Sequence, residues 1–451
     1  MSLKRVLTLR TVVATSAGLT LATSTFVAAV QVASFLAGNS AWMAILTGGC
    51  LCLLAAACFS ELNGQLPSAA GIRLYFSKAF NDQLALTISI LYMVVIMGVV
   101  GAESYVLANV LSLAVPFFPP LFWIILMFFI VTALNIRGIK IAGNFQDVIT
   151  YGLIGSLIII SFLAFRQVNF QVDSLLQVGS AGGLVQAIAV GVFLFVGFEW
   201  VTPLAEEVTD SRLISRGMLI AVGILSVTYA LFTVAMTVSV ERGTLVSSPV
   251  PQVIFAQKIL GRFGLFWIVI LSIAASITTF NAGLLSVSRF VYATAREHAL
   301  PAVFSKISMR YFTPWVAILT VLTVGLGVSI TVLLTGKYLV IVNIAAAMES
   351  IIYVLAGLAV LVLRKKHPVA SRPYQVPGGV SVPVLTSVFF AVLVFAILIT
   401  DFWVGFFIVL ALLFCWGYVR KVVPVLRQRH QARHPARRRR PVVEKPDPES
   451  L

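Results

Sequence analysis

Twelve stretches of this chain are apolar over a length that can cross a lipid bilayer. A transmembrane helix needs about 20 predominantly apolar residues, so these runs leave little of the chain for a soluble domain. Hydrophobic residues make up 60% of the 451 residues and charged residues only 11%, far from the balance of a soluble protein. We therefore predict an all-α polytopic membrane protein with 12 transmembrane helices. The approximate bounds of the runs are 12–36, 41–62, 84–113, 119–136, 146–165, 183–204, 216–240, 264–290, 314–335, 339–363, 383–400 and 402–420.

The positive charges lie mainly on one side of these predicted spans. The formal net charge is +16. With the N-terminus inside the cell, and leaving out the C-terminal tail, inner segments hold 17 of the Lys and Arg residues and outer segments hold 5. This is the bias that the positive-inside rule describes. We predict a multi-pass protein of the plasma membrane, or of the inner membrane in a bacterium, with both termini cytoplasmic.

Residues 421–451 form a tail with a different composition. The tail is rich in arginine, includes a basic run from Arg437 to Arg440, and is interrupted by Pro435 and Pro441. Such a segment is expected to be disordered. Because the tail begins next to a membrane helix, we expect its basic residues to meet anionic lipid headgroups, and we expect no nucleic-acid partner.

Two of the apolar runs are interrupted by small or polar residues. Residues 22–24 (Ala-Thr-Ser) lie within the first run, and residues 197–200 (Gly-Phe-Glu-Trp) lie within the sixth. Lipid cannot hydrogen-bond a loosened backbone, so such breaks face protein, a cavity or a ligand. Paired interruptions in two halves of a chain point to the binding site of a secondary transporter. The predicted substrate-binding residues are Ala22, Thr23, Ser24, Gly197, Phe198, Glu199 and Trp200.

Three glutamates lie inside apolar runs: Glu103 in the third, Glu199 in the sixth and Glu349 in the tenth. An ionisable side chain within the membrane is costly and is a functional hypothesis by default. Two interpretations of Glu199 are open, since it can bind a substrate ammonium group or be protonated and hold the break together by hydrogen bonds. Glu103 and Glu349 have no basic residue within four positions. Both are candidates for proton coupling or for recognition of a cationic group.

Several ordered motifs resemble those of the amino acid–polyamine–organocation permeases. In that family the second helix typically ends in Glu-Leu, followed by proline, small residues and glycine. The match covers about residues 12–380. The matching segments are Glu61-Leu62 with Pro67–Gly71, Asn135–Lys140, Phe145–Asp147, Glu206–Asp210, Asn281–Pro301 and Leu363–Gly379.

The resemblance implies a five-plus-five inverted-repeat (LeuT-like) core with broken helices 1 and 6. Residues 1–11 would be the cytoplasmic N-terminus, 12–380 the transport core of helices 1–10, and 381–420 the peripheral helices 11 and 12. Residues 421–451 would be the basic tail. The unwound middles of helices 1 and 6 would hold the substrate, with an aromatic side chain near the second break as a lid.

Gating residues are expected around helix 6. The lid candidates are Phe195, Phe198 and Trp200. On the predicted cytoplasmic side, Glu206 and Glu207 belong to a short mixed-charge segment, and Arg289 lies at the inner end of helix 8. We expect these charges to hold one conformation closed, although a solvated connector has the same composition.

The chain departs from the family pattern at two places. Many relatives have Gly-Ser-Gly where this chain has residues 22–24, so capture of a substrate carboxylate by bare backbone amides is in question. Sodium-independent exchangers often carry a lysine where Leu153 stands, so the coupling ion remains open. Ser276 and Thr279 would coordinate an ion only if transport were coupled to sodium. We expect no other metal site and no cofactor.

We predict a secondary active transporter that moves an amino acid by alternating access, coupled to protons or to a counter-substrate. One alternative is a permease for polyamines or other organic amines, which Glu103 and Glu199 would suit. A remote alternative is a membrane sensor without transport. We expect no enzyme activity, because the apolar runs contain no histidine cluster, serine–histidine pair or metal constellation.

Overall fold

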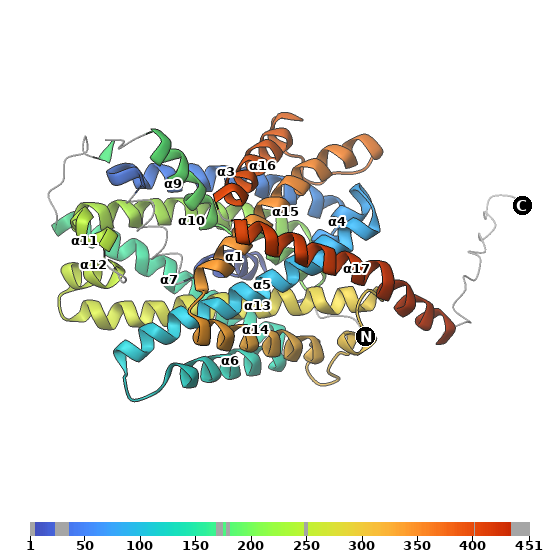
Figure 1. Ribbon diagram of the computed structural model, residues 1–451, viewed down its shortest axis with the longest axis horizontal. Helices are drawn as coiled ribbons and strands as arrows, with labels where there is room; N and C mark the ends of the chain where they lie inside the picture. The colour runs from blue at the N-terminus through green and yellow to red at the C-terminus, as the bar shows by residue number, and fades with distance from the viewer. Residues whose placement is uncertain are drawn as a thin grey trace, which may run out of the picture.

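The computed structural model describes residues 5–22, 36–167, 175–176, 181–247, 251–400 and 402–433. Within these residues the regular secondary structure is helical, apart from one isolated bridge between Leu7 and Val208. Long helices lie side by side, and the N-terminus and the end of the last helix lie at the same end of the molecule (Figure 1). We call this end the N-terminal end of the bundle.

Ten of the described helices are long and apolar enough to cross a membrane. They include stretches that are apolar on most faces, as expected where neighbours are lipid or other helices. The ten are α3 (Ala41–Gln65), α5 (Asp82–Ala114), α6 (Pro120–Arg137), α7 (Ile139–Gln167), α10 (Arg212–Ser239), α13 (Phe263–Arg296), α14 (Trp315–Thr335), α15 (Tyr338–Lys366), α16 (Ser381–Thr400) and α17 (Phe402–Arg433). The prediction of an all-helical membrane protein is confirmed for the described residues. The count of twelve spans and the inverted repeat remain predictions.

The first and sixth predicted runs do not form single long helices in the described residues. Helix α1 (Leu9–Thr20) covers the start of the first run, and residues 23–35, with Thr23 and Ser24, lie outside the described residues. Helix α9 (Ala181–Phe193) covers the first half of the sixth run, and the 3₁₀ helix η2 (Phe198–Glu206) covers the rest. Between them the chain turns at Gly197, whose φ is 101°. The sixth run is therefore broken where the sequence predicts.

Short elements connect the long helices. The 3₁₀ helix η1 (Gly38–Ser40) precedes α3, and α4 (Ile72–Ala79) joins α3 to α5. Helices α11 (Arg242–Ser247) and α12 (Pro251–Leu260) lie between α10 and α13. The 3₁₀ helix η3 (Ala302–Ser305) follows α13.

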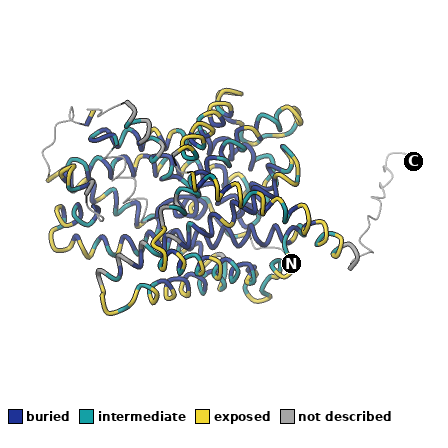
Figure 2. The backbone as a smooth tube through the Cα atoms, viewed as in Figure 1, coloured by how far each residue is buried: buried dark blue, intermediate teal, exposed yellow. Residues whose placement is uncertain are grey.

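Helix α1 lies in the interior of the bundle. All its residues from Thr11 to Thr20 are buried, and it packs against α7, α10, α13 and η2. Figure 2 shows the buried backbone concentrated in the inner helices and exposed residues on the outer turns. Helices α3 and α9 approach closely, because a Cβ added at Gly48 would lie 2.6 Å from the carbonyl carbon of Gly191. Helix α1 and η2, which lie next to the predicted breaks, are therefore largely enclosed by protein, as a loosened backbone in a membrane requires.

Helix α17 continues past the predicted end of the last span. It runs to Arg433, so the expectation of disorder from residue 421 is wrong for residues 421–433. Pro424 lies inside the helix, and Val419 and Val423 are buried. Contacts with the rest of the protein supply the stabilisation that the composition alone does not predict. Residues 434–451 lie outside the described residues.

Candidate functional site

The break between α9 and η2 is stabilised by a carboxyl group from another helix. Gly197 adopts a left-handed conformation that residues with a Cβ rarely adopt, and this turn leaves its amide without a helical partner. Glu349 on α15 accepts a 2.8 Å hydrogen bond from that amide through Oε1. Both residues are in the interior, since Glu349 is 1% exposed. The carboxyl group therefore meets the hydrogen-bonding need of the broken backbone.

Two glutamates and two tyrosines form a buried cluster at this break. The Tyr353 hydroxyl lies 2.6 Å from Oε1 of Glu349 and 3.1 Å from Oε2 of Glu199. The Tyr92 hydroxyl contacts the other carboxyl oxygen of each glutamate. All four side chains are buried. We call Tyr92, Glu199, Glu349 and Tyr353 the carboxyl cluster.

The tyrosine hydroxyls of the carboxyl cluster have fewer protons than the cluster has contacts. A tyrosine hydroxyl has one proton to donate, and an ionised carboxylate has none. The two hydroxyls therefore supply two protons for four contacts between a hydroxyl and a carboxyl oxygen. A third hydrogen bond requires a proton on Glu199 or Glu349. Two carboxylates this close in a buried site also disfavour double ionisation. The arrangement fits a glutamate pair that holds at least one proton.

Aromatic rings enclose the carboxyl cluster. The ring centroids of Tyr92 and Trp200 are 4.9 Å apart, and those of Phe198 and Tyr353 are 5.4 Å apart. Phe59 on α3 lies edge-on to both Phe198 and Tyr353. These rings keep water and lipid away from the carboxyl groups, which strengthens electrostatic interactions within the cluster.

The end of α1 is tied to η2 and α10. The Ser16 hydroxyl donates a 2.8 Å hydrogen bond to the carbonyl of Phe198, and the Tyr229 hydroxyl donates a 3.0 Å bond to the carbonyl of Thr20. Ala22, just after α1, is buried. Phe195 packs against Tyr229, with ring centroids 5.7 Å apart. The described parts of the two predicted breaks thus lie in one neighbourhood.

Glu103 lies apart from the carboxyl cluster. Glu103 and Tyr92 share helix α5, and 11 residues separate them along a rise of about 1.5 Å per residue. Glu103 is 2% exposed and lies near enough to Tyr229 to act on it electrostatically. The structure therefore separates Glu103 from Glu199 and Glu349, although the sequence singles out all three.

Helices α1, α7 and α13 meet in a polar junction. The Thr279 hydroxyl donates to the carbonyl of Gly18 at 3.2 Å. Thr150 on α7 donates to the carbonyl of Ala14 at 3.2 Å and contacts the Thr278 hydroxyl at 2.7 Å. Ser276 is buried on the same helix as Thr279. Sodium coordination by Ser276 and Thr279 remains a prediction.

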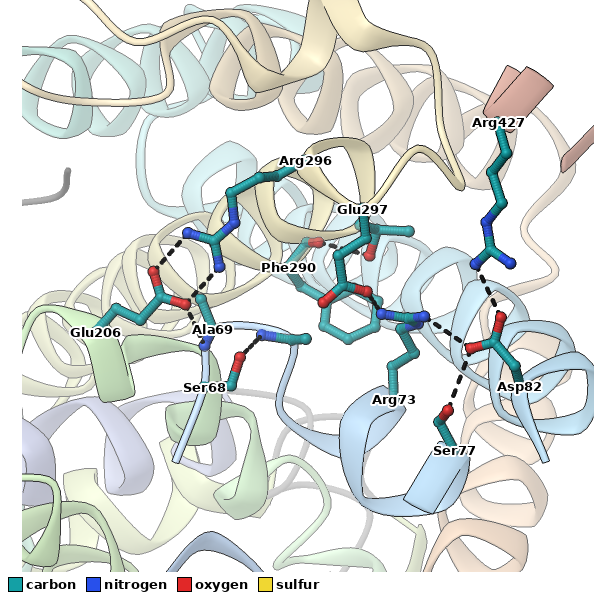
Figure 3. Close-up of polar contacts among 12 residues, drawn as sticks. Ser68, Ala69, Arg73, Ser77, Asp82, Glu206, Phe290, Arg296, Glu297 and Arg427 are labelled. Atoms are coloured by element: carbon teal, nitrogen blue, oxygen red, sulfur yellow. Dashed lines mark hydrogen bonds and ion pairs between the residues drawn. The ribbon is translucent and has the colours of Figure 1, made fainter. Parts of the chain in front are cut away.

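A layer of ion pairs lies at the N-terminal end of the bundle. Glu207 and Arg289 are both fully buried, and Arg289 Nε donates to Oε2 of Glu207 at 2.8 Å. Glu206 pairs with Arg296 on α13 through two hydrogen bonds of 2.6 and 2.8 Å. Leu7 donates its amide to the carbonyl of Glu207 at 3.0 Å. We call Glu206, Glu207, Arg289 and Arg296 the ion-pair layer (Figure 3 shows the Glu206–Arg296 pair).

The sequence singles out the glutamates of the carboxyl cluster and most of the ion-pair layer, but not their other members. Tyr92 and Tyr353 were not singled out, although a tyrosine within an apolar run needs a partner for its hydroxyl. Arg296 lies within the matching segment Asn281–Pro301, at the end of the predicted eighth helix. The roles predicted for Glu199, Glu349, Glu206, Glu207 and Arg289 remain predictions.

Comparison with known proteins agrees with an all-helical membrane transporter fold. Residues 7–419 match the family model described as "Amino acid permease". The chain is 28% identical over 368 residues to the Asc-type amino acid transporter 1 of Homo sapiens, covering 77% of this chain and 68% of the relative. It is 25% identical over 395 residues to the methylthioribose transporter of Bacillus subtilis, covering 82% and 83%. It is also 25% identical over 375 residues to the large neutral amino acids transporter small subunit 2 of Mus musculus, covering 76% and 67%.

Proposed function

This chain belongs to the amino acid permease family, which is a family of membrane transporters, and from that premise we propose that it is a secondary active transporter for an amino acid. The proposed mechanism is alternating access across the plasma membrane, with the substrate at the breaks of the first and sixth helices and a proton as the coupling ion. The observation that carries the proposal is the carboxyl cluster, in which Glu199 and Glu349 share two tyrosine hydroxyls at the break.

The break and two of the relatives support an amino acid as the proposed substrate. The Asc-type and large neutral amino acids transporters carry amino acids by name, and they share most of this chain's length. A half-helix N-terminus carries partial positive charge, which suits a carboxylate. A carboxyl group in the same break suits an ammonium group. An amino acid presents both groups, so it matches the two sides of the break.

The proton is proposed to act through the hydrogen bond between Gly197 and Glu349. When the glutamate pair loses its proton, two negative charges face each other in a site of low dielectric, and their repulsion is strong. Glu349 holds the Gly197 amide, so a movement of Glu349 reaches the break directly. The protonation state of the cluster is thereby linked to the shape of the substrate site.

The conformation described is closed at the N-terminal end, which we place on the cytoplasmic side. The fully buried ion pair of Glu207 and Arg289 connects the end of η2 to α13. The ion pair of Glu206 and Arg296 connects the same two elements. Opening toward the cytoplasm requires these contacts to separate. Separating a buried ion pair costs several kcal/mol of free energy unless water solvates each charge. The ion-pair layer therefore acts as a gate that opens only when water enters.

A permease for organic amines is the second candidate. Its support is the buried position of Glu103, Glu199 and Glu349, since several buried carboxyl groups suit a ligand with more than one positive charge. The absence of the family's glycine pair at residues 22–24 also weakens the case for carboxylate capture.

The test is uptake into proteoliposomes that contain the purified full chain. Labelled neutral and cationic amino acids and labelled polyamines are compared, each with and without an imposed proton gradient. The proposal predicts amino acid uptake that an inward proton gradient accelerates. Uptake of polyamines alone would favour the second candidate, and the absence of all uptake under any gradient would refute transport.

A further inference from the structure

The last turns of α17 are attached to the N-terminal end of the bundle. Figure 1 shows α17 passing α5 and extending beyond the other helices at this end. The Tyr418 hydroxyl donates a 3.2 Å hydrogen bond to the carbonyl of Ala299, and the rings of His298 and His430 stack with centroids 3.6 Å apart. Arg427 Nη2 donates to Oδ2 of Asp82 at 2.8 Å. The helix end is therefore bound to two separate elements.

Asp82 connects Arg427 to a second arginine. Its Oδ1 accepts hydrogen bonds from Arg73 Nη2 at 2.8 Å and from the Ser77 hydroxyl at 3.2 Å, while its Oδ2 binds Arg427. Both oxygens of one carboxylate are thus used, one toward α4 and one toward α17. Figure 3 shows Arg427, Asp82, Arg73 and Glu297 in a continuous series. Arg73 contacts Glu297, which follows directly after α13.

The chain around Arg73 is itself bound to the ion-pair layer. The amide of Ala69 donates a 3.2 Å hydrogen bond to Glu206, which also binds Arg296. Ala69 and Ala70 pack against Ala293 on α13, and all three are fully buried. The segment from Ala69 to Arg73 therefore lies against α13, next to the contacts that close this end.

We propose that Arg427 is a positioning residue for the gate at the N-terminal end, and that the end of α17 acts as a latch. Arg427 holds Asp82, Asp82 orients Arg73 toward Glu297, and Arg73 keeps the preceding segment against α13. Release of Arg427 loosens this series and makes opening more frequent. The inference rests on the proposed alternating access, because a latch has a role only if this end opens.

The expected effect is modest because the pair is partly exposed. The side chains of Arg427 and Asp82 are each 38% exposed. Exposed pairs stabilise by small amounts, so loss of Arg427 should raise the frequency of opening roughly two- to fivefold. An effect of this size changes the rate of a gated process without unfolding the protein.

The test measures how fast a cysteine behind the segment reacts with a thiol reagent. Ala293→Cys is introduced into the full chain carrying Cys50→Ser, which removes the exposed native thiol, and the protein is placed in lipid nanodiscs with a polar maleimide. The same chain without Ala293→Cys gives the background from the buried thiols. Four variants are made in the chain that carries Ala293→Cys, and their labelling rates are compared with the rate of that chain. The variants are Arg427→Ala, Arg427→Lys, Asp82→Asn, and the double variant Arg427→Ala/Asp82→Asn. Arg429→Ala is the matched control, since Arg429 is exposed on the same helix.

The latch predicts that Arg427→Ala and Asp82→Asn each speed labelling by roughly two- to fivefold, and that the double variant is no faster than either single one. Arg427→Lys, which keeps the charge, restores slow labelling, and Arg429→Ala leaves the rate unchanged. Equal rates for Arg427→Ala and Arg429→Ala, or additive effects in the double variant, would overturn the proposal. Labelling needs no substrate, so failure of transport in proteoliposomes is a separate result.

Discussion

The backbone amide of Gly197 donates a hydrogen bond to the carboxyl group of Glu349, which is 152 residues away in the chain. This 2.8 Å contact joins the break in the sixth helix to the interior of α15. Glu349 also belongs to the buried cluster with Tyr92, Glu199 and Tyr353. One side chain thus serves both the broken backbone and the group that we propose to carry the proton.

Gly197→Ala should distort the break. The φ of Gly197 is 101°, a conformation that costs a residue with a Cβ about 1–2 kcal/mol. An added Cβ would also lie 2.7 Å from Cδ2 of Leu19. We expect a lower unfolding temperature and a large loss of uptake. Gly223→Ala in α10 is the control, because nothing lies within 4 Å of its Cβ position and alanine favours the helix. Equal effects of the two substitutions would contradict this account of Gly197.

Arg289→Met should destabilise the protein strongly, because it leaves Glu207 as a buried charge without its guanidinium partner. Both side chains of the pair are fully buried. The expected loss is about 3–5 kcal/mol, measured by chemical unfolding in detergent. The double variant Glu207→Leu/Arg289→Met removes both charges and should lose less than Arg289→Met alone. A double variant less stable than Arg289→Met would show that the pair is not the reason for the loss.

The contribution of Glu206 should depend on pH in the acidic range. Burial by itself raises the pKa of Glu206, but hydrogen bonds from Arg296 and Ala69 and the positive charges of Arg296 and Arg5 lower it below its ordinary value. A lowered pKa stabilises the folded state above the unfolded pKa of about 4.3, and this stabilisation is lost as the pH falls through the folded pKa.

Thermal unfolding of the wild type and Glu206→Gln as a function of pH tests this expectation. The difference in unfolding temperature should be constant above about pH 5 and shrink below it. Glu241→Gln, at an exposed position, is the control. A difference that does not change with pH would mean that the carboxylate charge of Glu206 does not stabilise the ion-pair layer.

Glu103→Gln should leave proton coupling intact. Glu103 lies about three turns along α5 from Tyr92, and we infer a role in recognising the positive charge of the substrate. The expected result is a higher KM for substrate, with the ratio of protons to substrate unchanged. Loss of gradient-driven uptake while exchange persists would instead place Glu103 in the coupling path.

The sequence predicts much of the fold because lipid imposes simple rules. Apolar length identifies the ten long helices, and the Gly197 break is visible because a glycine and a glutamate interrupt an apolar run. The partners of Glu199 are different. Tyr92 is 107 residues away and Tyr353 is 154 residues away, so only the tertiary fold, in which α5 packs against α15, brings them together.

The end of α17 illustrates a second limit. Residues 421–433 carry four Lys and Arg residues, and the sequence predicts disorder for them, yet they are helical. The helix buries Val423, and Arg427 contacts Asp82, which lies 345 residues earlier in the chain. The composition of a segment does not reveal its contacts with residues that are distant in the chain. Thr23 and Ser24 lie outside the described residues, so their predicted role remains a prediction.

The most direct test of the central claim is proton movement during uptake. Proteoliposomes are loaded with a pH-sensitive dye, and the internal pH is followed when an amino acid that the wild type transports is added outside. We predict internal acidification with the wild type and with Glu103→Gln. Glu349→Gln should abolish acidification while exchange of labelled for unlabelled substrate persists. Undiminished acidification with Glu349→Gln would contradict the account, because the glutamate pair would then not carry the coupling proton.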